Sequence, residues 1–253
     1  MLHRNTGINI SRLTGKAYRD GPYKTWKRRL LTLLWVWLTV SNVTVIIFRW
    51  LPIPVTPLML IRMAENVTGP RNVKLQYQWI PAGKMASNMP WAVMASEDQL
   101  FMEHHGFDFK SIKAAVNANK KRTNKTLGAS TISQQCARNV FLWQGRNWIR
   151  KGLEAYFTIL IEFWWSKERI MEVYLNVIEM GDGIYGAEAA SQSFFKHSAN
   201  RLSMNEAALI AAVLPGPRKW SPKRPSPYVF KRQRQITRQM KLIERPYWWD
   251  GYP

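Results

Sequence analysis

The sequence predicts a mainly α-helical protein, with one compact helical domain behind a single N-terminal transmembrane helix. Residues 30–48 contain no charged side chain, and after residue 80 apolar residues recur at helical spacing behind capping residues. The chain has 253 residues, of which 46% are hydrophobic, so it can bury one substantial core. These observations favour one domain with appendages over two full domains.

Residues 30–48 are predicted to cross a membrane. As a helix they span about 28 Å, close to the hydrocarbon thickness of a bilayer. The residues before them are strongly basic and include one acid, Asp20. The positive-inside rule therefore places residues 1–29 in the cytoplasm as a basic tail and the later chain outside it. The alternative is a cleaved signal peptide, but the apolar run exceeds the usual length of about 7–15 residues and no small-residue cleavage site follows.

The charge balance predicts a polyanionic partner. The formal net charge is +21, with 37 Lys and Arg against 16 Asp and Glu, which suits nucleic acid or an anionic lipid surface. The predicted topology favours lipid and argues against nucleic acid. Residues 231–241 contain five basic residues and no acid and form a charged helix face, which is either solvated or adheres to anionic lipid. The lone Cys136 allows no internal disulfide and suits a bacterial envelope protein.

The segments after the anchor differ in character. Residues 49–72 are largely apolar and broken by prolines, so they are predicted to lie along the membrane surface. The extracytoplasmic domain is then 73–253. Residues 73–80 alternate apolar and polar side chains, which predicts one short strand, and everything after them is predicted to be helical.

Helix starts and ends are predicted from capping residues. Helices are expected at about 90–105, from Ser130 or Thr131 onward, at about 148–165, from Ser166 to about 178, and after a capping box at 203–206. Residues 120–129 form a predicted mobile basic loop. The second helix is predicted to bury Ile132, Cys136 and Val140, and the third to bury Ile149, Leu153, Tyr156, Leu160 and Trp164.

One acidic residue breaks the apolar pattern. On the predicted helix 90–105, Glu97 shares a stripe with Val93, Leu100, Phe101 and His104. Such a carboxylate is either a core residue satisfied by a salt bridge or backbone donors, or a catalytic group whose pKa is raised by burial.

Hydrogen-bonding and basic side chains cluster further along the chain. The stretch 128–139 contains Ser130, Thr131, Gln134, Gln135 and Asn139, and the stretch 146–155 adds Arg146, Arg150, Lys151 and a second acid, Glu154. Guanidinium groups suit phosphate and amides suit sugar hydroxyls. The two stretches therefore predict an anionic, hydroxyl-rich ligand.

These residues resemble the motifs of the peptidoglycan glycosyltransferases of family 51, and most closely their monofunctional biosynthetic members. The resemblance covers about 90–222. The motif EDxxFxxHxG is matched by Glu97, Asp98, Phe101, His104 and Gly106, GxSTIxQQxxxN by residues 128–139, and RKxxE by residues 150–154. Residues 166–176 and 204–222 resemble the fourth and last blocks of the family, in the same order.

The resemblance implies a lysozyme-like helical fold and the polymerisation of lipid II, an undecaprenyl-pyrophosphate-linked disaccharide-pentapeptide, into glycan strands. Glu97 would be the general base that takes the proton of the acceptor hydroxyl. Arg138, where family members often carry lysine, would neutralise the leaving pyrophosphate together with Arg146, Arg150 and Lys151. Glu154 would assist there by orienting a basic residue, by helping to hold a divalent cation such as Mg²⁺ or Mn²⁺, or by touching substrate.

The resemblance also implies further substrate-binding residues, partners and a location. The residues are Asp98, Phe101, His104, Ser130, Thr131, Gln134, Gln135 and Asn139, with His104 either shuttling a proton or orienting Asp98 or a backbone group. Partners would be lipid II, the growing glycan strand, the membrane, penicillin-binding transpeptidases and cell-division proteins. The location would be the bacterial inner membrane, with a single pass and the catalytic domain on the periplasmic side.

Two other classes of protein remain alternatives. A lysozyme-like lytic enzyme would cleave peptidoglycan around one glutamate, but it has no pyrophosphate to neutralise. A membrane-anchored cationic binding protein would explain the charge and leave the polar helix after residue 130 unexplained.

Overall fold

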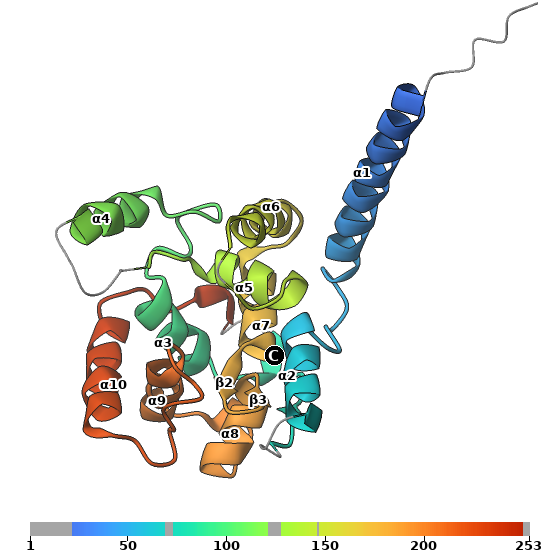
Figure 1. Ribbon diagram of the computed structural model, residues 1–253. Coiled ribbons are helices and arrows are strands. Elements are labelled where there is room, and N and C mark those ends of the chain that lie inside the picture. The colour runs from blue at the N-terminus through green and yellow to red at the C-terminus, as the bar shows by residue number, and fades with distance from the viewer. Residues whose placement is uncertain (1–21, 69–72, 121–127, 146, 250–253) are drawn as a thin grey trace, which may run out of the picture. The chain divides into compact units, whose positions relative to one another are not determined.

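A computed structural model describes residues 22–68, 73–120, 128–145 and 147–249 (Figure 1). The chain divides into two compact units, Met1–Thr44 and Val45–Pro253. Helix α1 (Pro22–Ile47) makes up the described part of the first unit and ends in the second. Among the described residues, Thr25–Ile47 is long and apolar enough to cross a membrane, in agreement with the anchor predicted at 30–48.

The second unit is mainly helical, as predicted. Its described α-helices are α2 (Pro57–Thr68), α3 (Asn88–Glu97), α4 (Phe109–Lys120), α5 (Ile132–Phe141), α6 (Trp148–Trp164), α7 (Lys167–Val177), α8 (Ala187–Phe195), α9 (Met204–Val213) and α10 (Pro227–Met240). Short 3-10 turns lie at Ala82–Lys84, Ala199–Arg201 and Tyr247–Trp249.

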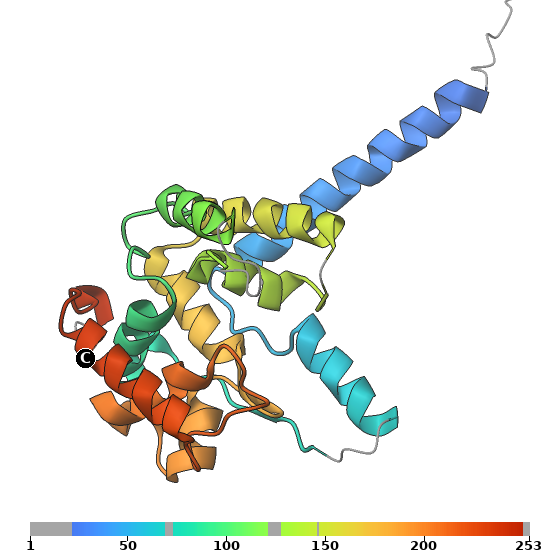
Figure 2. The same ribbon diagram turned by 60° about the vertical axis from the view of Figure 1, so that its left-hand side comes forward.

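Two groups of helices build this unit and share one core. Helix α5 packs against α2, α6 and α7, while α9 packs against α3 and α10 (Figures 1 and 2). A continuous hydrophobic cluster joins the groups, with Val93 of α3, Ile132 of α5, Ile170 of α7 and Ile210 of α9 all fully buried. Helix α3 is therefore packed into this core.

The caps predicted from sequence are confirmed for three helices. Thr131 caps α5 and Ser166 caps α7, each accepting a hydrogen bond from a backbone N–H of the first turn. Ser203 forms a capping box ahead of α9. The stripe Ile132, Cys136 and Val140 is buried, as predicted.

The strand prediction was only partly correct. Side-chain burial alternates along 73–80, but only β1 (Gln76–Tyr77) pairs. It lies parallel to β3 (Ile184–Tyr185), which is antiparallel to β2 (Glu179–Gly181). The expectation that everything after residue 80 is helical was therefore wrong, because these strands are defined by pairing between distant segments, which local periodicity does not register.

The predicted inner stripe of α6 was only partly correct, because Leu153, Tyr156, Leu160 and Trp164 are partly buried against the core but Ile149 is not. Ile149 is 76% exposed, and the buried face instead carries Arg150, Glu154, Phe157 and Ile161. Phe157 stacks on Phe141 of α5, with ring centroids 4.5 Å apart. The helix is apolar on both sides, so spacing alone could not decide which side faces α5.

Other predicted segments are described in part. In the predicted membrane-proximal segment, Pro57 starts α2, and this helix buries Leu58 and Met59. Most of the basic loop predicted at 120–129 lies outside the described residues. In α10, Val229, Ile236 and Met240 are buried, whereas Lys231, Arg234 and Arg238 are exposed.

Candidate active site

Glu97 is the last residue of α3, so the helix predicted at 90–105 is shorter than expected. Asp98 leaves helical geometry, with φ −162° and ψ 83°, while its N–H still bonds to the carbonyl of Met94. Residues 99–106 then form turns, and Leu100 and Phe101 do not share a helical stripe with Glu97. The premise for singling out Glu97 was therefore incorrect, although its carboxylate does lie at a cleft.

Asp98 ends the helix because its side chain bonds to groups elsewhere in the fold. Its buried carboxylate accepts a hydrogen bond from the backbone N–H of Ile132 at 2.9 Å, in the first turn of α5. His104 Nε2 lies 3.0 Å from both carboxylate oxygens, so this nitrogen is the N–H donor. Of the two roles expected for His104, orienting Asp98 matches the observed geometry.

Several residues of the second motif fix the start of α5. Thr131 Oγ1 donates to the carbonyl of Gly106 at 2.7 Å, and Thr131 and Gln134 form a capping box. Gly106 has φ +86°, and a Cβ there would lie 2.8 Å from Cγ2 of Thr158, so only glycine fits this approach. Thr131 and Gln134 are thus engaged within the protein, and their role in substrate binding stays a prediction.

Gln135 connects α5 to the end of α3. Its Nε2 donates to Oε2 of Glu97 at 3.0 Å, and its Oε1 accepts a hydrogen bond from the hydroxyl of Tyr174 at 3.2 Å. The tyrosine side chain is fully buried on α7. Tyr174 therefore fixes which end of the amide faces the glutamate.

The environment of Glu97 raises its pKa above the ordinary value of a glutamate. Burial is the main cause, and the negative charge of Asp98 acts in the same direction. The hydrogen bond from Gln135 and the positive charges of Arg232 and Arg138 partly oppose this rise. A carboxyl group with increased proton affinity is better suited to proton transfer near neutral pH.

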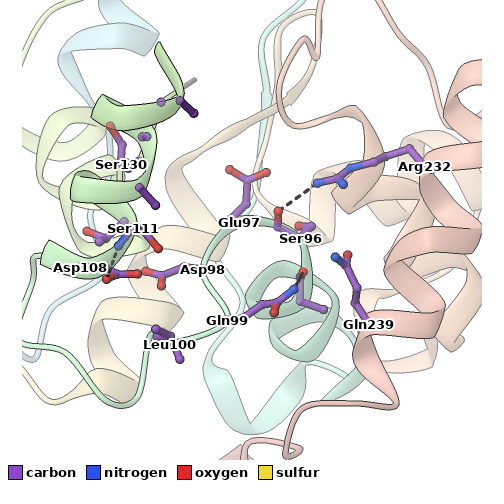
Figure 3. A pocket seen from close by; sticks show the side chains of 17 residues that line it. Ser96, Glu97, Asp98, Gln99, Leu100, Asp108, Ser111, Ser130, Arg232 and Gln239 are labelled. Carbon is purple, nitrogen blue, oxygen red and sulfur yellow. Dashed lines mark hydrogen bonds between the residues drawn. The ribbon is translucent and has the colours of Figure 1, made fainter. Parts of the chain in front are cut away.

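The carboxylate lines a cleft of about 730 Å³. Figure 3 shows Glu97 and Asp98 between Ser130, Ser111 and Asp108 on one side and Arg232 and Gln239 on the other. The cleft is thus formed by the end of α3, by α4, by the residues before α5 and by α10. Phe101 is fully buried, with Lys167 Nζ 4.7 Å from its ring centroid, and is absent from the cleft lining.

The second predicted acid lies in a different environment. Glu154 on α6 is 1% exposed, and its carboxylate binds Arg150 Nη1 at 2.8 Å and Lys151 Nζ at 2.5 Å. Of the roles expected for Glu154, orienting basic residues matches this geometry. To coordinate a metal ion, the carboxylate would have to leave both partners, and the described residues include no group of three or more His, Cys, Asp or Glu that could hold one.

The remaining predicted residues surround a smaller pocket. Arg138 and Asn139 line a cavity of about 190 Å³ together with Gln135. Asn139 Nδ2 also donates to the backbone carbonyl of Gln135 at 2.8 Å. Arg146 lies outside the described residues.

Sequence reasoning missed the contribution of α10. Arg232 Nη2 donates to the carbonyl of Ser96 at 3.0 Å, directly before Glu97, and Gln239 lines the same cleft (Figure 3). A signal was available, because Arg232 and Gln239 share the helical stripe of the buried Val229 and Ile236. The sequence prediction for this segment instead concerned only its charged face.

Comparisons with known proteins identify the class. A family model described as Transglycosylase matches residues 65–241, which is well over half of the chain. The helical fold with its glutamate cleft is accordingly that of a lysozyme-like transglycosylase domain.

Curated relatives narrow this class. Proteins named "Biosynthetic peptidoglycan transglycosylase" match from Bdellovibrio bacteriovorus, with 50% identity over 218 residues, and from Bacteroides thetaiotaomicron, with 48% identity over 228 residues. These matches cover 86% and 90% of this chain and 87% and 92% of the relatives. The relative from Haemophilus influenzae is 46% identical over 225 residues, or 88% of this chain and 92% of its own. The chain therefore belongs to the family of biosynthetic peptidoglycan transglycosylases and is a glycosyltransferase enzyme.

Proposed function

We propose that this enzyme polymerises lipid II into glycan strands and releases undecaprenyl pyrophosphate. The observation that carries this proposal is Glu97, whose carboxylate lines a cleft of about 730 Å³ and whose pKa is raised by burial. That volume lies in the range of substrate sites, roughly 300–1,000 Å³. A cleft carboxylate of increased proton affinity is the group that deprotonation of a sugar hydroxyl requires.

The proposed reaction exchanges one bond at the anomeric carbon of the growing chain. The acceptor hydroxyl oxygen attacks this carbon while its proton passes to Glu97, and the bond from the carbon to the pyrophosphate oxygen breaks. The lipid pyrophosphate leaves with the bonding electrons. Gln135 holds Oε2 of Glu97, so Oε1 is the oxygen that takes the proton. General-base catalysis of this kind contributes about 10²–10⁴-fold in rate.

Basic residues would stabilise the leaving pyrophosphate. Arg138 lines the small pocket beside Gln135, and Glu154 would keep Arg150 and Lys151 in fixed positions. The two ion pairs of Glu154 occupy the carboxylate oxygens that would otherwise be available to Mg²⁺ or Mn²⁺.

We further propose that α1 anchors the enzyme in the bacterial inner membrane with the domain on the periplasmic side. The support is the apolar helix behind a basic N-terminal stretch. Contact with penicillin-binding transpeptidases and with cell-division proteins belongs to the same proposal. Protease added to spheroplasts should digest the chain beyond residue 60 and leave the N-terminal tail protected. The reverse pattern would contradict this topology.

Polymerisation must be distinguished from lysis, because a lytic enzyme would also use one glutamate in a lysozyme-like fold. The relatives are named as biosynthetic, which favours polymerisation. A purely cationic binding protein would need neither the cleft nor Glu97. The test incubates the full-length protein in detergent with lipid II and, separately, with finished glycan. We expect polymer from lipid II and no fragments from glycan. Fragments from glycan without polymer from lipid II would show that the enzyme cleaves peptidoglycan and does not synthesise it.

A further inference from the structure

A second pocket is lined by Gln135, the residue that donates a hydrogen bond to the Glu97 carboxylate. Its volume is about 190 Å³, smaller than the roughly 300 Å³ at which drug-sized ligand sites begin, so it suits a compact group. Its lining is mostly polar and comes from α2, α5, α7, β2 and the segments beside them. The polar lining residues are Arg62, Gln135, Arg138, Asn139, Gln144, Tyr174 and Glu179.

The cations expected to bind pyrophosphate are not equally available. Arg150 and Lys151 are bound by Glu154. Arg138 forms no ion pair with any residue that the structure describes, and its buried Nε has no hydrogen-bond partner there. A buried guanidinium N–H without a partner is costly, and an anionic ligand would satisfy it.

Arg62 of α2 supplies a second guanidinium to this pocket. Its Nη1 pairs with Glu65 at 2.6 Å, but that glutamate side chain is 51% exposed, so the pair adds little stability. Its buried Nε forms an ion pair with Oε2 of Glu179 at 3.9 Å, a distance too long for a hydrogen bond.

The pocket is linked directly to the catalytic carboxylate. Gln135 lines the pocket and donates to Glu97, so a group in the pocket lies beside the residue that holds the base. We infer that Arg62 of α2 contributes a second guanidinium to the pyrophosphate site proposed at Arg138, which rests on the proposed function. Arg62 precedes the matched region 65–241 and lies in the segment that sequence reasoning assigned only to the membrane surface.

The alternative is that Arg62 only fastens α2 to the domain. Two variants separate these roles. Arg62→Gln removes the charge from the pocket, whereas Glu65→Gln breaks the surface ion pair and keeps the guanidinium. The full-length protein in detergent is titrated with inorganic pyrophosphate by calorimetry, and KM and kcat for lipid II are measured in parallel.

We expect Arg62→Gln to weaken pyrophosphate binding roughly ten- to a hundredfold, the effect of losing a charge-assisted contact. Glu65→Gln should bind as well as wild type or better. Arg62→Lys should fall between, because it keeps the charge but loses the guanidinium fork. If Arg62→Gln fails to fold, the pyrophosphate affinity of Arg62→Lys is compared with that of wild type instead, since lysine can still pair with Glu65.

Equal pyrophosphate affinities in wild type and the folded Arg62 variants would overturn the inference, as would no binding to wild type. Equal losses of Tm in Arg62→Gln and Glu65→Gln with unchanged affinity would assign Arg62 to fastening α2. The binding assay needs no turnover. A wild type that binds pyrophosphate through Arg62 but does not polymerise lipid II would reject the proposed function and leave the anion site in place.

Discussion

Glu97 and Glu154 are both glutamates close to the core, but their surroundings differ. Glu97 lies at a cleft, and its carboxylate accepts a hydrogen bond from the neutral amide of Gln135. Glu154 is almost fully buried and bound by two cations. A neutral donor leaves burial free to raise proton affinity, whereas two cations neutralise a carboxylate and keep it in place. This difference therefore predicts that Glu97 transfers the proton and that Glu154 positions basic residues.

The largest expected effect is on the activity of Glu97→Gln. The amide keeps the shape of the side chain and removes the proton acceptor, so lipid II polymerisation should fall by about 10²–10⁴-fold. The protein should still unfold cooperatively and still bind inorganic pyrophosphate. Glu103→Gln, at an exposed position six residues away, is the control and should polymerise normally. Near wild-type polymerisation by Glu97→Gln would mean that this glutamate is not the base.

Glu154→Gln should reduce the stability of the protein more than it reduces its activity. Removing the carboxylate leaves Arg150 buried without its ion pair, which should cost about 2–3 kcal/mol because glutamine keeps one hydrogen bond. Thermal denaturation measures this loss, and Glu65→Gln in an exposed pair should cost less than about 1 kcal/mol. Polymerisation per folded molecule should fall less than in Glu97→Gln. Unchanged Tm with a larger loss of activity would place Glu154 in the chemistry.

The same contrast explains what the sequence could and could not predict. Helices α5, α7 and α9 follow from local caps, because Thr131, Ser166 and Ser203 bond within their own first turns. The end of α3 was missed because Asp98 bonds to Ile132, which is distant in sequence. Capping residues therefore predict where a helix begins, whereas a hydrogen bond to a residue distant in sequence can end a helix earlier than its local sequence predicts.

The candidate site shows the same division. The motifs brought attention to Glu97, Gln135 and Glu154, and the structure connects the first two directly. They could not show that Arg150 and Lys151 are bound by Glu154, because helical spacing permits that pairing without requiring it. Arg232 lines the larger cleft from α10, and Arg62 lines the smaller pocket from α2. These helices are far apart in sequence, so only the folded structure shows which pocket each arginine lines.

Arg232→Gln should shift the pH dependence of the reaction. This effect should be smaller than the loss of activity expected for Glu97→Gln. The positive charge of Arg232 lowers the pKa of Glu97, while Arg138 acts in the same direction and Asp98 in the opposite one. Removing Arg232 therefore raises this pKa, and the acidic limb of kcat/KM should move to higher pH because the base must be deprotonated. Arg234→Gln removes the same charge from an exposed position of α10 and should leave the limb in place. Identical profiles in the two variants would remove Arg232 from the control of Glu97.

The smallest expected effect concerns the stability of Glu97→Gln. Because burial raises the pKa of Glu97 in the folded state, the folded protein holds this proton more tightly than the unfolded chain does. The resulting stability is fully present below the pKa of a solvated glutamate, about 4.3, and is lost as pH rises through the folded pKa.

Glutamine resembles the protonated form and does not lose this contribution. The free energy of unfolding of Glu97→Gln minus that of wild type should therefore increase from about pH 4 upward and level off above the folded pKa. Urea denaturation in detergent across this range measures it, and Glu103→Gln provides the reference for removing one exposed carboxylate. A difference that stays constant with pH, or declines as pH rises, would show that the fold does not raise the proton affinity of Glu97. The general-base role would then depend on substrate binding to desolvate the carboxylate.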